Sequence, residues 1–155
     1  MTRQESYRIV IEAEIRSQML YEALAKSFRS AHTDFVFDEL IILEKAHEEK
    51  VRAAFKKEFP NEDFKLMENL KLDLLGIDLS DPKNLLDFAI SREELANSIY
   101  LDMAKESKDE GIKAMMLKFA DEENQHKALL LAEIQRIQGA MKWYDPSELD
   151  GFMDD

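Results

Sequence analysis

The chain has 155 residues with four glycines, three prolines and no cysteine, which favours one helical domain and excludes disulfides, thiolate zinc sites, iron–sulfur clusters and a cysteine nucleophile. Its net charge of −12 and its lack of a basic cluster argue against nucleic-acid binding. Because no signal-peptide pattern and no apolar run of membrane-spanning length is present, we expect a cytoplasmic protein without membrane attachment.

Apolar residues at steps of three and four predict four helices, over about residues 3–31, 34–58, 82–108 and 112–138. Pro82 suits the first turn of the third helix, and Gly139 is expected to end the fourth. The short first and last turns and the long middle connection predict an all-α, antiparallel four-helix bundle with one long crossover. The bundle is expected over residues 1–140, followed by a C-terminal tail over 141–155.

One pattern of residues occurs twice in the chain, with every member displaced by 79 positions. The paired positions are Glu14 and Glu93, Tyr21 and Tyr100, Glu44 and Glu123, and His47 and His126. Gln18 and Asn97 occupy a further pair of equivalent positions. The repeat predicts a pseudo-twofold bundle in which the first helix matches the third and the second matches the fourth.

The repeated residues place carboxylates and imidazoles on inward-facing helix stripes. In Glu44-x-x-His47 and Glu123-x-x-His126 the two side chains lie on one helix face, a turn apart. Buried carboxylates must be neutralised by protons, partners or metal. Four carboxylates balance two divalent ions, and an oxygen-rich shell with one nitrogen per ion favours iron or manganese, with zinc as an adventitious substitute.

This arrangement resembles the ferritin-like di-iron carboxylate superfamily over about residues 3–138, and it is most similar to the rubrerythrin branch. The resemblance implies two iron ions in an Fe–O–Fe type centre, with the ligands Glu14, Glu44, His47, Glu93, Glu123 and His126. It implies that Glu44 and Glu123 bridge the two ions. It also implies that Tyr21 and Tyr100 are hydrogen-bond donors that orient ligand carboxylates.

The implied function is an oxidoreductase of the peroxidase or ferroxidase type that reacts with peroxide or O2 in oxidative-stress defence. A ferritin-type iron-storage subunit and a bundle that binds a non-redox metal remain open alternatives. The sequence departs from rubrerythrins in having no cysteine for a rubredoxin module, so we expect an external electron-donor protein or reductase. Ala96 and Asn97 also stand where that family carries an extra glutamate. The family expectation for assembly is a homodimer.

Other polar residues have less specific interpretations. Gln18 and Asn97 are predicted to hydrogen-bond ligand carboxylates or a metal-bound water, with a polar rim position as an equal alternative. His32 is interpreted as a surface or capping residue, and Tyr7 as packing. The acids that neighbour the ligands in sequence point about 100° away on a helix and are expected to be solvated or paired, namely Glu12, Glu48, Glu94 and Glu122. Among them, Glu94 is the nearest candidate for a seventh carboxylate of the site.

Overall fold

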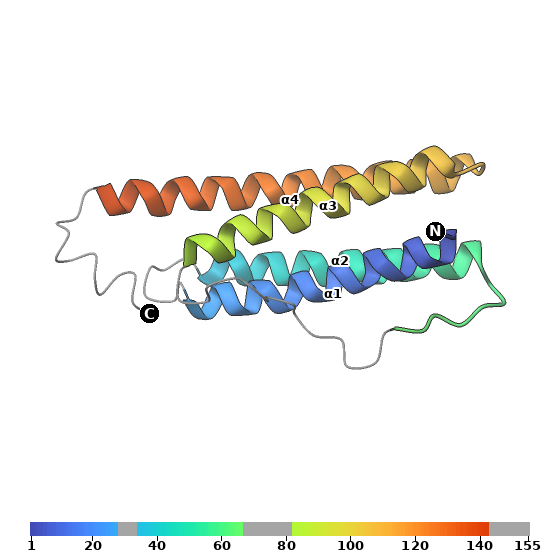
Figure 1. The fold of residues 1–155 in the computed structure, drawn as a ribbon, viewed down its shortest axis with the longest axis horizontal. Helices are drawn as coiled ribbons and strands as arrows, with labels where there is room; N and C mark the ends of the chain where they lie inside the picture. The colour runs from blue at the N-terminus through green and yellow to red at the C-terminus, as the bar shows by residue number, and fades with distance from the viewer. Residues whose placement is uncertain (28–33, 67–81, 143–155) are drawn as a thin grey trace.

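The computed structural model describes residues 1–27, 34–66 and 82–142 (Figure 1). The described part forms four helices, α1 (Arg3–Ser27), α2 (Asp34–Glu58), α3 (Pro82–Glu106) and α4 (Glu110–Lys142). Figure 1 shows α1 beside α2 as one hairpin and α3 beside α4 as a second hairpin stacked on the first. The predicted all-α four-helix bundle is confirmed. His32 and residues 143–155 of the predicted tail lie outside the described residues.

Two helix starts are fixed by side-chain caps. At α1 the Thr2 hydroxyl accepts a hydrogen bond from the Glu5 amide, and the Glu5 carboxylate accepts one from the Thr2 amide, both at 3.1 Å. This reciprocal capping box satisfies two amides that have no partner within the helix. At α4 the Asp109 carboxylate accepts hydrogen bonds from the amides of Gly111 and Ile112, at 2.8 and 3.1 Å. The cap explains why α4 begins two residues before the predicted start.

The predicted end of the fourth helix at Gly139 is wrong, because α4 continues through Gly139 to Lys142. A glycine within a helix costs about 1 kcal/mol relative to alanine, but it does not by itself terminate the helix. The residues that follow, Ala140, Met141 and Lys142, are good helix formers and carry the helix onward.

The hydrophobic core consists of two clusters with a polar layer between them. The first, here called the Tyr7 cluster, includes Tyr7, Ile11, Val51, Phe55 and Met103. The second, here called the Leu24 cluster, includes Leu24, Phe37, Leu40, Leu85 and Leu130. On every helix the repeated glutamate lies in sequence between residues of the two clusters, so the polar layer is closed off on both sides along the bundle axis.

The end of α2 and the start of α3 lie at opposite ends of the bundle. Tyr7, near the start of α1, donates a hydrogen bond to Glu58 at the end of α2, whereas Leu85 of α3 packs in the Leu24 cluster. The connection therefore has to span the bundle length, as predicted. Its first residues, 59–66, dock on α1 and α2, where the Phe64 ring lies 5.3 Å from that of Phe55.

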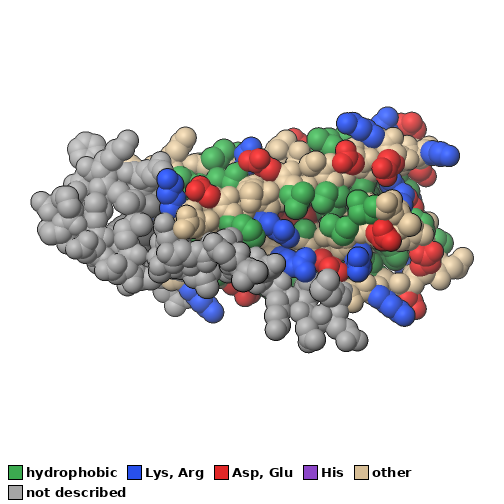
Figure 2. All heavy atoms as spheres, in the orientation of Figure 1, with side chains coloured by type: hydrophobic (Ala, Val, Ile, Leu, Met, Phe, Trp, Pro, Cys, Tyr) green, Lys and Arg blue, Asp and Glu red, His purple; other side chains and the backbone are tan. Residues whose placement is uncertain are grey.

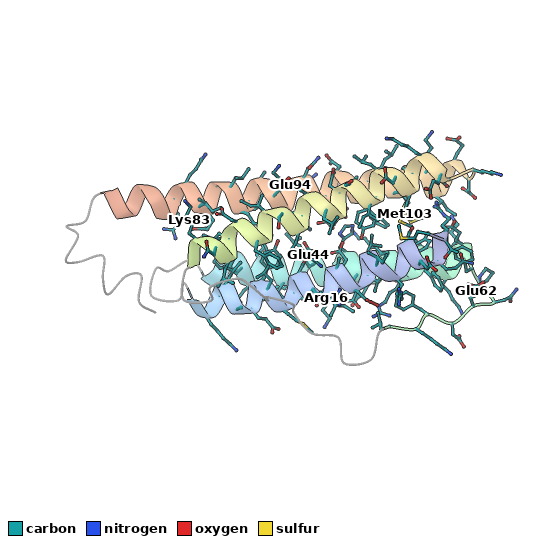
Figure 3. All side chains as sticks on the ribbon, in the orientation of Figure 1. Arg16, Glu44, Glu62, Lys83, Glu94 and Met103 are labelled. Atoms are coloured by element: carbon teal, nitrogen blue, oxygen red, sulfur yellow. The ribbon has the colours of Figure 1, made fainter. Side chains whose placement is uncertain are left out.

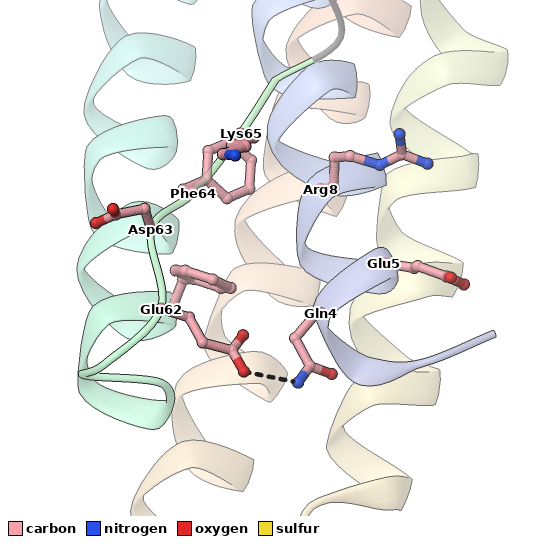
Figure 4. Close-up of a pocket in the computed structure, with 8 residues that line it drawn as sticks. Gln4, Glu5, Arg8, Glu62, Asp63, Phe64 and Lys65 are labelled. Atoms are coloured by element: carbon pink, nitrogen blue, oxygen red, sulfur yellow. Dashed lines mark hydrogen bonds between the residues drawn. The ribbon is translucent and has the colours of Figure 1, made fainter.

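A surface hollow of about 180 Å³ lies where this connection meets α1 (Figure 4). The Gln4 amide donates a hydrogen bond to the Glu62 carboxylate across it, at 3.4 Å. Its lining contains none of the repeated glutamates or histidines. The hollow is therefore separate from the polar layer in the core.

Acidic and basic side chains are interspersed over the face of the described helices in Figure 2, with hydrophobic side chains between them. The large apolar side chains exposed there or elsewhere on the described helices include Ile42, Leu95, Leu117 and Leu131. None of the described helices is long and apolar enough to cross a membrane.

Candidate metal centre

Six buried polar side chains from all four helices meet in the layer between the two core clusters. They are Glu14 of α1, Glu44 and His47 of α2, Glu93 of α3, and Glu123 and His126 of α4. In Figure 3 the labelled Glu44 lies between the two helix hairpins, in the middle part of the bundle. The structure thus brings together all six residues that the sequence repeat singled out.

The six residues form two overlapping groups of four. Ligand atoms of the first group, Glu14, Glu44, His47 and Glu123, all lie within 4.8 Å of one another. The same holds for the second group, which consists of Glu44, Glu93, Glu123 and His126. Glu44 and Glu123 belong to both groups, and each of the other four belongs to one. This is the geometry of two adjacent sites that share two carboxylates.

The histidine contacts show the twofold relation between the halves. His47 Nδ1 lies 2.7 Å from Glu123 Oε1, and His126 Nδ1 lies 2.8 Å from Glu44 Oε1. Each imidazole also has the glutamate of a neighbouring helix near it, with His47 Nδ1 3.3 Å from Glu14 and His126 Nδ1 3.7 Å from Glu93. In both histidines it is therefore Nδ1 that faces the carboxylates of this six-residue cluster.

Two buried tyrosines reach across the bundle to carboxylates of the opposite hairpin. Tyr100 on α3 donates a hydrogen bond to Glu14 on α1, and Tyr21 on α1 donates one to Glu93 on α3. Burial, together with the nearby carboxylates, raises the pKa of both phenols well above the usual value. Both hydroxyls therefore keep their protons and remain hydrogen-bond donors.

The four carboxyl groups divide into two classes by acidity. Burial and the neighbouring carboxylates raise the pKa of Glu44 and of Glu123 well above the usual range. Burial also acts to raise the pKa of Glu14 and Glu93, but favourable interactions with the neighbouring carboxyls and with the histidines outweigh it and lower both values. Without metal, these shifts favour the protonated form of Glu44 and Glu123 and the ionised form of Glu14 and Glu93.

Many of the oxygen and nitrogen atoms of these six side chains have no hydrogen-bond partner within the described residues. Of the seven buried side-chain nitrogen and oxygen atoms without a hydrogen-bond partner in the described residues, six belong to the cluster. They are Oε2 of Glu14, Oε2 of Glu44, both ring nitrogens of His47, Oε2 of Glu93 and Oε1 of Glu123. The close contact between His47 Nδ1 and Glu123 Oε1 lacks the geometry of a hydrogen bond. Buried polar groups in proteins almost always have partners. A concentration of unpaired oxygen and nitrogen donors fits a pair of metal ions.

The two repeated amides have other partners than those predicted. Gln18 donates a hydrogen bond to Glu48 of α2 at 2.8 Å, and Asn97 donates one to the backbone carbonyl of Ala120 in α4 at 2.7 Å. Neither bond goes to a predicted ligand carboxylate, and both side chains are partly buried between the helices of one hairpin, which agrees better with the alternative interpretation of a polar rim position. They join α1 to α2 and α3 to α4.

The remaining acids behave largely as their sequence positions indicated. Glu94 is 55% exposed and pairs with Lys127 at 3.2 Å, and Figure 3 shows it away from the space between the hairpins. Glu48 pairs with Arg52 at 2.7 Å as well as with Gln18. Tyr7 packs in the core as predicted, and its hydroxyl in addition bonds to Glu58.

The sequence pattern did not predict that Glu122 contacts one of the site residues. Its carboxylate lies 3.4 Å from Nε2 of His47, on the side of the ring opposite the cluster, and 3.5 Å from the ammonium of Lys50. The repeat gave no signal for it, because the position 79 residues earlier is Leu43. The sequence could have indicated Glu122 through its charge, because it is a charged residue directly next to the predicted ligand Glu123 on a helix that packs in the bundle.

Comparisons with known proteins agree with the fold of the bundle. A hypothetical protein from Pyrococcus furiosus has the same fold, with a TM-score of 0.76, 24% identity and 94% of each chain covered. An uncharacterised conserved protein from Magnetospirillum magnetotacticum gives a TM-score of 0.66 at 23% identity, covering 88% of this chain and 95% of its own. No curated protein matches the sequence. Residues 84–149, which include the second copy of the repeat, match the Rubrerythrin family model, in agreement with the resemblance seen in the sequence.

Proposed function

We propose that this chain binds two iron ions in the layer between its core clusters and acts as an oxidoreductase on peroxide or O2. The observation that carries the proposal is the pair of four-residue groups that share Glu44 and Glu123. A carboxylate with two oxygens can contact two ions, so these two residues would bridge them. Glu14 and His47 would complete one position, and Glu93 and His126 the other.

The charge and the donor types of the cluster support this assignment. Two divalent ions carry four positive charges, which balance four carboxylates once Glu44 and Glu123 lose their protons. Carboxylate oxygens with one imidazole for each ion suit iron or manganese, and the chain has no thiolate to favour a softer metal. The family match over residues 84–149 supports iron between these two.

Bound iron would supply one-electron redox chemistry and Lewis acidity at two adjacent ions. The chain supplies the surroundings for that chemistry. Tyr100 and Tyr21 hold the carboxylates of Glu14 and Glu93 in place by hydrogen bonds. The Tyr7 and Leu24 clusters cover the layer at its two ends and limit the access of water. We further propose an external electron donor, because the 155 residues contain no cysteine for a rubredoxin-type site.

The test is iron loading of metal-free protein under anaerobic conditions, followed by exposure to hydrogen peroxide. We expect two iron ions per chain, and a visible iron(III) absorption band that develops in proportion to the peroxide consumed. Glu44→Ala, which removes a carboxylate common to both groups, should abolish binding and the band. Glu94→Ala, an exposed neighbour of Glu93, should change neither.

Two results would count against the proposal. Fewer than one iron per chain after loading would remove the centre altogether. Two bound iron ions that stay iron(II) in excess peroxide would remove the redox role. Competition of manganese and zinc with iron, measured by metal analysis after dialysis, decides the preferred metal.

A further inference from the structure

The twofold repeat is broken at one pair of positions beside the metal centre. Glu122 precedes Glu123 on α4, whereas its equivalent on α2 is Leu43, which precedes Glu44. Lys50, the ion-pair partner of Glu122, is likewise replaced by Leu129 in the other half. One half of the centre thus has a charged pair where the other half has two leucines.

The charged pair of the first half lies directly behind His47. The Glu122 carboxylate approaches His47 Nε2 with one oxygen, at 3.4 Å, and Lys50 with the other, at 3.5 Å. Its side chain is 19% exposed, while that of Lys50 is 53% exposed. The three residues therefore connect a buried imidazole to the protein surface through one largely buried carboxylate.

The tautomer of a metal-bound His47 explains what this carboxylate would do. Nδ1 of His47 faces Glu14 and Glu123, so a metal in that group of four would bind Nδ1. A neutral imidazole that binds metal through Nδ1 carries its hydrogen on Nε2 and needs an acceptor there. Nε2 has no hydrogen-bond partner within the described residues, and the Glu122 oxygen is in reach of it. A carboxylate acceptor fixes the ring and makes Nδ1 a stronger ligand.

The repeat equivalent of Glu122, which is Leu43, cannot serve as such an acceptor for His126. Leu43 is partly buried and packs against the Leu24 cluster, so its side chain is committed to apolar contacts. An isobutyl group accepts no hydrogen bond and adds no negative charge near the ring. The two imidazoles, which are equivalent in the repeat, therefore differ in whether the residue at the Glu122 position can accept a hydrogen bond.

We propose that Glu122 is a positioning residue that makes the two metal positions unequal, so that the position with His47 binds a divalent ion more tightly than the position with His126. This inference rests on the proposed function, because it assumes that the two groups of four bind metal. A carboxylate behind a histidine ligand typically changes metal affinity by about 10–100-fold. We therefore expect two binding steps separated by about that factor.

The test is a calorimetric titration of metal-free protein with Co(II), with the d–d absorption of bound cobalt as a second readout. The unchanged chain should show two steps of different affinity. Glu122→Leu, which copies the other half, should weaken the tight step by about 10–100-fold and bring the two steps together. Glu122→Gln keeps an acceptor oxygen and should weaken it less, and Leu43→Glu should strengthen the weaker step.

Single-site backgrounds assign the effect to one position. With His126→Ala, only the His47 position keeps its imidazole, and adding Glu122→Leu should lower the remaining Co(II) affinity. With His47→Ala, adding Glu122→Leu should change nothing. Glu94→Leu is the matched control at an exposed neighbour of a ligand. Circular dichroism of each metal-free variant verifies that it folds, so that a lost binding step is not a lost fold.

The outcomes separate this inference from the proposed function. Two equal binding steps in the unchanged chain, or an unaltered tight step in both Glu122 variants, would overturn the inference while leaving a two-metal centre intact. An unchanged chain that binds no Co(II) would instead remove the centre on which both statements depend.

Discussion

Tyr100 and Glu14, which lie 86 positions apart in the chain, are joined by a buried hydrogen bond of 2.8 Å that connects the two helix hairpins. The bond joins α3 to α1 at the level of the cluster. Its repeat equivalent, from Tyr21 to Glu93, joins the same helices in the opposite direction. The carboxylates on α1 and α3 are thereby held by the hairpin to which they do not belong.

Removal of the Tyr100 hydroxyl should weaken both the fold and the metal centre. Tyr100→Phe leaves a buried carboxylate oxygen without its donor, which costs about 1–3 kcal/mol of stability in urea unfolding of the metal-free protein. The same change should lower metal affinity by about 10–100-fold, because Glu14 is no longer held in place. Tyr7→Phe is the matched control, since it removes a hydroxyl bond to Glu58 away from the cluster. It should lower stability and leave metal affinity unchanged; equal metal affinities in all three proteins would contradict the assigned role of Tyr100.

Metal uptake near neutral pH should release protons. The pKa values of Glu44 and Glu123 are raised by burial and by nearby carboxylates, so both groups are protonated before metal binds and must ionise to bind it. The apparent metal affinity should consequently rise as pH rises. Titration calorimetry in two buffers with different ionisation enthalpies measures the proton count directly. Identical heats in both buffers would show that the two carboxyls are already ionised.

The same raised pKa values determine how the stability of the metal-free protein depends on pH. For a carboxyl with a raised folded-state pKa, the contribution to stability is full below the unfolded value, here 4.5, and is lost as pH rises through the folded value. Glu44→Gln mimics the protonated acid and does not titrate. As pH rises from 4 to 9, the free energy of unfolding of this variant should therefore increase relative to that of the wild-type chain. Glu94→Gln, at an exposed position, should follow the unchanged chain across the range, and a Glu44→Gln curve parallel to it would contradict the assignment.

The sequence was sufficient to predict the parts of the structure that repeat. The period of 79 residues placed all six buried donors and both tyrosines, because each had an equivalent with the same chemistry in the other half. Apolar periodicity gave the four helices, and the long connection followed from the length of chain between Glu58 and Pro82. These features depend on local patterns that one chain displays without any partner.

The features that the sequence did not predict depend on contacts between helices. Gln18 and Asn97 lie on the inward stripe, but the packing of the helices within each hairpin places their amides against Glu48 and the Ala120 carbonyl. Glu122 points away from its own ligand neighbour and toward His47 of another helix, which no spacing along α4 indicates. Helix-periodic spacing gives the face of a helix on which a residue lies, and packing decides what that face meets.

Gly139 has a low helix propensity but lies inside α4, so a substitution at this position tests the observed course of the helix. Gly139 has no non-neighbouring atom within 4 Å of the place that a Cβ would occupy, and α4 continues past it to Lys142. Gly139→Ala should therefore raise stability by about 0.5–1 kcal/mol, because alanine loses less conformational entropy in a helix. Urea unfolding of the metal-free protein measures the change. Gly111→Ala is the contrasting variant, since its Cβ would lie 3.1 Å from the Asp109 oxygen that caps α4, and we expect it to give a smaller gain or a loss. A loss of stability in Gly139→Ala would contradict this expectation. It would instead favour the prediction from sequence that the fourth helix ends at Gly139.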